Sequence, residues 1–131
     1  MTMSEAKPEL LDTIPYVWVA DVKQAIPFYR DKLGFEVEFE FYWVSEGARY
    51  GLALMNRDKI TLHLRVCECG DGRHTGTSFY QVLMKGIDAL HAEYEQAGAK
   101  ILFPPTTQDW GVRDFQVEDP EGNRIYFFED V

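Results

Sequence analysis

The stretch from Cys67 to His74, C-E-C-G-D-G-R-H, contains the side chains best suited to chemistry, because it combines two thiols, an imidazole and two carboxylates. Such groups bind transition metals in proteins. A structural zinc site needs four ligands and usually a C-x₂₋₄-C pair, whereas this stretch offers C-x-C and one histidine. In an extended strand the Cα atoms of Cys67 and Cys69 would lie about 6.6 Å apart, near the upper limit for a disulfide. We therefore expect two free thiols here and no metal.

The same stretch is expected to join two parts of the chain. Gly70, Gly72 and Gly76 are typical of a flexible connection. The chain has 131 residues, of which 46% are hydrophobic and 15% aromatic. That is enough to build one compact domain or two small packed modules. Residues 67–76 are therefore predicted to be a linker.

Composition argues against several classes of function. The formal net charge of −9 makes nucleic acids poor partners, since phosphate binding needs clustered Lys and Arg, whereas a cationic small molecule would be attracted. No apolar run approaches the ~20 residues of a membrane span. The polar N-terminus lacks the basic start and apolar core of a signal peptide. We expect a cytoplasmic protein without membrane partners, whose residues 1–12 form a flexible tail.

The first half of the chain is predicted to form a strand, a helix and three further strands. Residues 14–19 are β-branched and aromatic, which favours a strand. Asp21 can cap a helix that Pro27 should kink near its start and Gly34 should end. Residues 35–41 alternate perfectly between apolar and acidic side chains, which predicts a half-buried strand. The apolar side chains expected to share its face are Phe35, Val37, Phe39 and Phe41.

The second half repeats this order. A strand-like run is followed by a helical pattern over residues 86–98 and by a strand that Pro104 and Pro105 should end. A hairpin around D-P-E-G closes the chain. We predict an α+β fold of two tandem βαβββ modules, residues 13–66 and 77–131, with cupped mixed sheets.

Two motifs resemble the vicinal oxygen chelate superfamily, and most closely its bleomycin-resistance members. They are F-Y-R-D-K-L-G-F and W-G-x-R-x-F-x-x-x-D-P-x-G-N, and the resemblance extends from Thr13 onward. It implies two curved βαβββ sheets and a homodimer that exchanges N-terminal strands, with ligand clefts at the subunit interface. Pro15 stands where the resemblance places the hinge of that exchange, although an ordinary proline at a sheet edge fits the position equally.

The superfamily also includes metalloenzymes, which hold an ion with His and Glu side chains at four strand positions. By resemblance these positions fall on Ile14, His63, Phe79 and Tyr126, and only His63 can bind a divalent ion. We therefore expect no metal, no cofactor and no catalytic residue.

Aromatic side chains take the place of metal ligands in the expected site. The resemblance makes Trp110 a residue of the ligand groove, and Phe39 and Tyr50 are expected to join it, since such rings stack on flat heteroaromatic ligands or on cations. Asp109 could attract a cationic group, and His63 could donate or accept a hydrogen bond inside the cup. For Phe35, Val37 and Phe41 a place in the core is expected.

The predicted function is non-catalytic capture of a bleomycin-type antibiotic in an aromatic, acidic cleft between two subunits. One alternative is a lyase or isomerase of the same superfamily with an atypical metal site. The other is a ligand-sensing or interaction module.

Overall fold

The computed structural model describes residues 7–131 and contains two four-stranded sheets. Residues 1–6 of the predicted tail lie outside the described residues. The first sheet has the order β1-β4-β3-β2 and the second the order β5-β8-β7-β6. In each sheet the first-named pair is parallel and the other pairs are antiparallel. This identical order confirms the predicted tandem repeat and fold class.

Each half contains its helix and strands in the predicted order. The elements of the first half are β1 (Tyr16–Trp18), α1 (Val22–Pro27), the π-helical turn η2 (Phe28–Lys32), β2 (Glu36–Ser45), β3 (Ala48–Arg57) and β4 (Ile60–Arg65). Those of the second half are β5 (Phe79–Leu83), α2 (Ile87–Ala97), β6 (Lys100–Thr107), β7 (Val112–Glu118) and β8 (Arg124–Asp130). No helix among residues 7–131 is long and apolar enough to cross a membrane.

The first helix changes its winding at Pro27. Asp21 caps the helix as predicted, since its Oδ1 accepts a hydrogen bond from the Gln24 amide at 3.2 Å. Pro27 is the last residue of α1, and the chain then widens into η2, where the Leu33 amide donates to the Phe28 carbonyl at 3.2 Å. The irregularity therefore lies at the end of α1 and not in its first turns, because proline disturbs the hydrogen-bond ladder where it stands. Gly34 ends the helix with φ of 79°.

A β-bulge in β2 contradicts the predicted alternation of residues 35–41. Val37 pairs with Met55, but Phe39 pairs with Leu54, so Glu38 is an extra residue in the register. Val37 therefore faces the helices with buried Met55, whereas Phe39 faces the opposite side. The exposed fractions are 51% for Phe39 and 54% for Phe41. The expected place of Phe41 in the core is therefore wrong.

Strand β6 also differs from its prediction, because it continues through Pro104 and Pro105 to Thr107. Its pairing with β7 is irregular between Ile101 and Thr106, where the prolines lie. Proline is tolerated there because β6 is the edge strand of its sheet and one side of its backbone needs no partner.

The cysteines form a disulfide, which corrects the expectation of two free thiols. Cys67 and Cys69 are bonded, and their Cα atoms are 5.2 Å apart. The segment is a bend and not an extended strand, so the two residues come closer than the extended geometry predicts.

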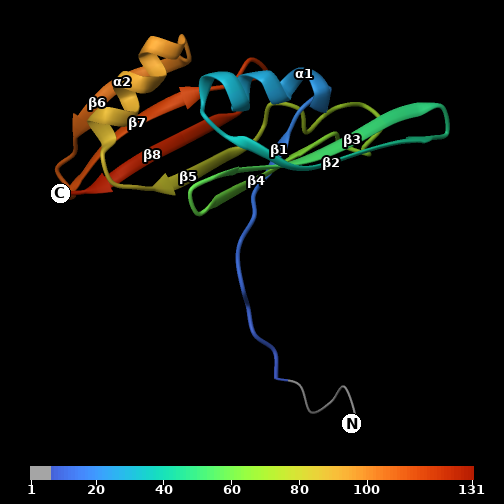
Figure 1. Cartoon of the computed structure of the whole chain (residues 1–131), viewed down its shortest axis with the longest axis horizontal. Coiled ribbons are helices and arrows are strands. Elements are labelled where there is room, and N and C mark those ends of the chain that lie inside the picture. Colours follow the sequence, from blue (N-terminus) through green and yellow to red (C-terminus); the bar gives the residue numbers. More distant parts are fainter. Residues whose placement is uncertain (1–6) are drawn as a thin grey trace.

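Both modules share one hydrophobic core on the helical side of the sheets. Figure 1 shows α1 and α2 on the same side of the molecule, and the segment before β1 leaving from the opposite side. The core cluster joins residues of α1, η2 and the first sheet to residues of α2 and the second sheet. Tyr94 of α2 adds a polar link, since its hydroxyl donates to the Leu33 carbonyl at 2.9 Å.

Two buried polar residues in the β7–β8 turn, Asp119 and Asn123, connect the two modules. We call this pair the inter-module latch. Asn123 accepts a hydrogen bond from the Ser78 amide at 2.9 Å and donates to the Trp18 carbonyl and to Asp119, each at 2.8 Å. Asp119 also accepts a bond from the Tyr29 hydroxyl at 2.7 Å. The latch therefore connects β1 and η2 of the first module with the second module.

The end of the linker packs closely against the same turn. The Gly76 amide donates to the Trp18 carbonyl at 3.0 Å. A Cβ atom at Gly76 would lie only 2.1 Å from the carbonyl oxygen of Glu121. Glycine is required at this position by backbone contact, in addition to its φ of 74°.

Replacing Asn123 with alanine should destabilise the whole protein, because it leaves the Ser78 amide without its partner and removes one of the two donors to the Trp18 carbonyl. We expect the free energy of unfolding to fall by about 2–4 kcal/mol in urea denaturation. Asn56→Ala is the control, since Asn56 accepts one bond from Thr61 within a single sheet and should cost about 1 kcal/mol. Equal losses in the two variants would contradict the role of the latch.

Candidate functional site

The face of the first sheet that is turned away from the helices carries most of the exposed aromatic rings. Helix α1 packs on β3 and β4, and the buried residues of these strands alternate with partly exposed ones. Because successive strand residues point to opposite faces, the partly exposed residues lie on the side away from α1. The residues that we call the aromatic face are Tyr16, Trp18, Phe39, Phe41, Trp43, Tyr50 and His63.

Strand register places these side chains in rows across the sheet. Tyr16 lies opposite His63, His63 opposite Leu54, and Leu54 opposite Phe39. Trp43 lies opposite Tyr50 at the outer end of the face. The β2 bulge makes these rows possible, because without it the rings of β2 would point toward the helices.

The rings contact one another and form a stacked surface. Trp43 is stacked between Phe41, at a centroid distance of 5.8 Å, and Tyr50, at 5.7 Å. The guanidinium group of Arg65 lies 5.0 Å from the centre of the Trp43 ring. Such a surface suits a flat aromatic ligand, since it already presents rings in the offset geometry that stacking favours.

His63 lies inside this surface with unused hydrogen-bonding capacity. Its ring meets the Tyr16 ring edge-on at 4.6 Å, and its Nε2 is buried without a hydrogen-bond partner among residues 7–131. Burial, followed by the nearby positive charge of Arg65, lowers the pKa of His63 below its ordinary value of 6.5. At neutral pH the imidazole is therefore uncharged and can donate to or accept from a ligand.

The corresponding face of the second sheet is more polar. A cavity of about 380 Å³ lies there, lined by Phe79, Tyr80, Gln81 and Tyr126. Gln81 lies opposite Tyr126 in the parallel pair β5–β8, as Tyr16 lies opposite His63 in the parallel pair β1–β4. The internal repeat thus places four side chains at equivalent positions, and only His63 among them is a common metal ligand. No group of three or more His, Cys, Asp or Glu side chains that could hold a metal gathers within residues 7–131.

Trp110 and Asp109 lie apart from the aromatic face, in the turn between β6 and β7 of the second sheet. Trp110 is 71% exposed, and Gly111 after it has φ of 91°. The structure therefore brings Phe39, Tyr50 and His63 together on the first sheet and places Trp110 and Asp109 on the second.

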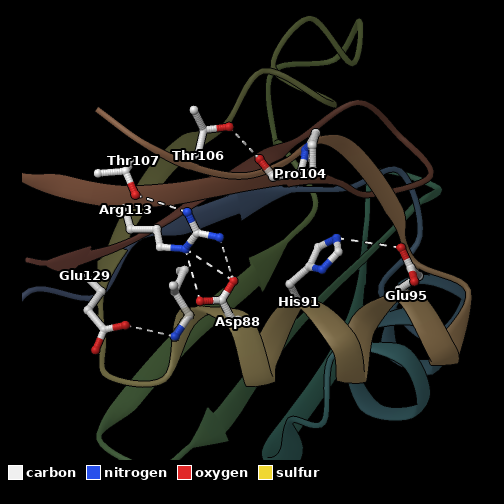
Figure 2. Close-up of polar contacts among 9 residues, drawn as sticks. Asp88, His91, Glu95, Pro104, Thr106, Thr107, Arg113 and Glu129 are labelled. Atoms are coloured by element: carbon white, nitrogen blue, oxygen red, sulfur yellow. Dashed lines mark hydrogen bonds and ion pairs between the residues drawn. The ribbon is translucent and has the colours of Figure 1, made fainter. Parts of the chain in front are cut away.

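The ends of this turn are held by an arginine bridge. In Figure 2 Arg113 lies between Asp88 of α2 and Thr107 of β6. Its Nη1 donates to the Thr107 hydroxyl at 3.1 Å, and its Nη2 donates to Asp88 at 2.8 Å. The backbone amide of the adjacent Gln108 donates to the Val112 carbonyl at 2.7 Å. These hydrogen bonds therefore hold both ends of the turn that carries Trp110.

Pro15 lies where the N-terminal segment leaves the first sheet. Its carbonyl accepts a hydrogen bond from the His63 amide at 3.0 Å. Before it, Leu10 and Leu11 are 99% and 85% exposed. Two adjacent leucines in water leave apolar surface for another contact.

Sequence reasoning missed part of this site. Tyr16, Trp18 and Trp43 were not singled out, although each stands at an alternate position of a strand-like run. For Trp43 the signal was obscured because Glu38 shifts the alternation by one residue. Gln81 was also missed, since the resemblance pointed to Phe79, which lies opposite Arg124 instead.

Comparison with known proteins identifies the family of this chain. Residues 11–127 match the family model described as the glyoxalase/bleomycin resistance protein/dioxygenase superfamily, and the chain belongs to this superfamily. It is 31% identical over 140 aligned residues to the bleomycin resistance proteins of Geobacillus stearothermophilus and Staphylococcus aureus, covering 93% of this chain and 98% of each relative.

Solved structures of other proteins have the same fold. The bleomycin-binding protein of Streptomyces verticillus, crystallised with copper(II)-bleomycin, is 25% identical with a TM-score of 0.70, over 92% of this chain and 97% of that one. TioX from Micromonospora sp. ML1 shares the fold with a TM-score of 0.71 at 21% identity, over 90% of this chain and 97% of that one.

We expect the imidazole signals of His63 to titrate in NMR with a midpoint below 6.5, because burial disfavours its charged form. The unfolded chain then binds the proton more readily than the folded protein, so the free energy of unfolding should decrease as the pH falls from about 6.5 through the folded-state pKa. His63→Gln should remove this part of the pH dependence. A midpoint at or above 6.5 would contradict the buried, uncharged state.

Proposed function

We propose that this protein captures a bleomycin-type antibiotic, or a related flat cationic metabolite, and sequesters it without breaking a bond. The observation that carries the proposal is the exposed aromatic face on the first sheet. The bleomycin resistance proteins and the bleomycin-binding protein among its relatives support the choice of ligand.

The physical basis of capture is stacking combined with charge attraction. Phe41, Trp43 and Tyr50 offer rings whose planes are inclined by 29° and 25° to their neighbours, and a planar heteroaromatic group can stack on them. The net charge of −9 attracts a cationic ligand at long range. Each protein molecule that binds a ligand keeps that ligand from its other targets. The amount of ligand withheld is therefore proportional to the amount of protein, and the covalent structure of the ligand need not change.

The complete cleft, in this proposal, forms between two copies of the chain. A sheet face with six exposed or half-exposed rings is large for a monomer in water. If the aromatic face of one copy meets the second sheet of its partner, Trp110 and Asp109 reach Phe39, Tyr50 and His63 across the interface. Leu10 and Leu11 would then pack on the partner, with the chain turning at Pro15.

Copper(II)-bleomycin should bind with about one molecule per chain in isothermal titration calorimetry, and should be recovered with unchanged mass after the protein is denatured. Trp110→Ala should weaken binding about tenfold or more, since it removes a large ring from the cleft. Val44→Ala is the matched control, because Val44 is 68% exposed and points to the opposite face of β2 from the aromatic rings, and should leave the affinity nearly unchanged. Absence of binding, or release of a modified ligand, would overturn the proposal.

The dimer is tested separately by light scattering after gel filtration. We expect a mass of twice the 15.2 kDa of one chain. Leu10→Asp combined with Leu11→Asp should shift the mass toward one chain, because two charges replace apolar contacts in the interface. A wild-type protein that remains monomeric at micromolar concentration would contradict the interface cleft.

A further inference from the structure

A buried carboxylate lies behind the cavity of the second sheet. Asp114 of β7 is 2% exposed, and its Oδ1 accepts a hydrogen bond from Gln108 Nε2 at 3.0 Å. Its Oδ2 accepts a hydrogen bond from the Tyr126 hydroxyl. Tyr126 also lines the cavity, so it stands between the carboxylate and the space that a ligand can enter.

The cationic side chains near Asp114 form ion pairs with other acidic residues. Arg113 is the neighbouring residue in β7, so it points to the opposite face, where it is paired with Asp88. Arg124 of β8 lies 3.5 Å from Glu118. The two groups bonded to Asp114 in the described part of the chain, Gln108 and Tyr126, are neutral. A buried carboxylate held only by neutral donors favours the arrival of a positive charge.

The hydrogen-bond pattern also fixes what the cavity can recognise. The single hydroxyl hydrogen of Tyr126 is directed to Asp114, so its oxygen can only accept a hydrogen bond from a ligand. Burial, together with the bond to Asp114, raises the pKa of Tyr126 to about 12, so the hydroxyl keeps its proton at neutral pH. Gln81, directly opposite in the register, adds an amide carbonyl as a second acceptor.

We propose that Asp114, Tyr126 and Gln81 form a subsite for a cationic N–H donor, such as an amidinium, guanidinium or primary ammonium group, carried on a flat apolar body. Phe79, on the same face as Gln81, supplies an apolar wall for that body. The assignment deepens the proposed function, on which it rests, by naming where the charged part of the captured molecule lies.

The test uses three probes of nearly equal size and different charge: benzamidine, benzamide and benzoate. Two-dimensional NMR of the labelled full-length protein measures each dissociation constant and locates the bound probe through the side-chain amide of Gln81 and the backbone amides of β5 and β8. Benzamidine should bind about tenfold or more tightly than benzamide, since a charge-assisted hydrogen bond is stronger than a neutral one. Benzoate should bind more weakly than either.

Two substitutions identify the source of this preference. Asp114→Asn keeps the shape but removes the charge, so it should abolish the preference for benzamidine while changing benzamide affinity little. Tyr126→Phe removes the accepting oxygen and should weaken the binding of both benzamidine and benzamide. Glu46→Gln, in the exposed turn between β2 and β3, removes the same charge elsewhere and should preserve the preference.

The outcomes separate this subsite from the proposed function. A preference for benzamidine that is lost in Asp114→Asn and kept in Glu46→Gln supports the subsite, even if copper(II)-bleomycin does not bind, in which case only the captured molecule must be reconsidered. Equal binding of benzamidine and benzamide, a preference unchanged in Asp114→Asn, or shifts confined to residues outside β5 and β8 would overturn the subsite, even if copper(II)-bleomycin binds.

Discussion

The buried hydrogen bonds of the inter-module latch determine how the two sheets are placed relative to each other. The Trp18 carbonyl and the Ser78 amide are partly buried at the boundary between the modules, so these backbone groups need hydrogen-bond partners there. Asn123 supplies them, since it binds the Trp18 carbonyl and the Ser78 amide across the module boundary. Asp119 extends the same network to η2 through Tyr29. The aromatic face and the cavity of the second sheet lie on the two sheets fixed in this way.

The repeat gives both halves one architecture but different surface chemistry. In the first sheet the parallel pair presents Tyr16 and His63, surrounded by rings, whereas in the second sheet it presents Gln81 and Tyr126, next to a buried acid. One sheet is therefore suited to stacking and the other to charge and hydrogen bonds. In the proposed dimer, an interface that brings unlike sheets together would offer both to a ligand with a planar part and a cationic part.

The order of the elements could be predicted from the sequence because local signals agreed with the tertiary structure. The cap at Asp21, the stop at Gly34 and the turn D-P-E-G all act within a few residues, and the structure confirms them. The site was harder to predict, because the alternation around Phe39 gives no sign of a register shift that depends on the pairing of β2 with β3. Likewise, the strand predicted to end at Pro104 continues in the structure, because it lies at the edge of its sheet. The sequence does not show which strand lies at an edge. The placement of Trp110 on one sheet and Phe39 on the other also follows from topology and not from spacing.

The bulge at Glu38 has a consequence for how this protein could diversify. Glu38 is the residue of β2 that has no partner on β3, whereas Phe39, Phe41 and Trp43 lie opposite Leu54, Leu52 and Tyr50. Deleting Glu38 would remove the bulge and leave these three pairs unchanged, so the rings would keep their face. The bulge therefore lets β2 lose one residue without exchanging the recognition surface, while the remainder of the scaffold stays as it is.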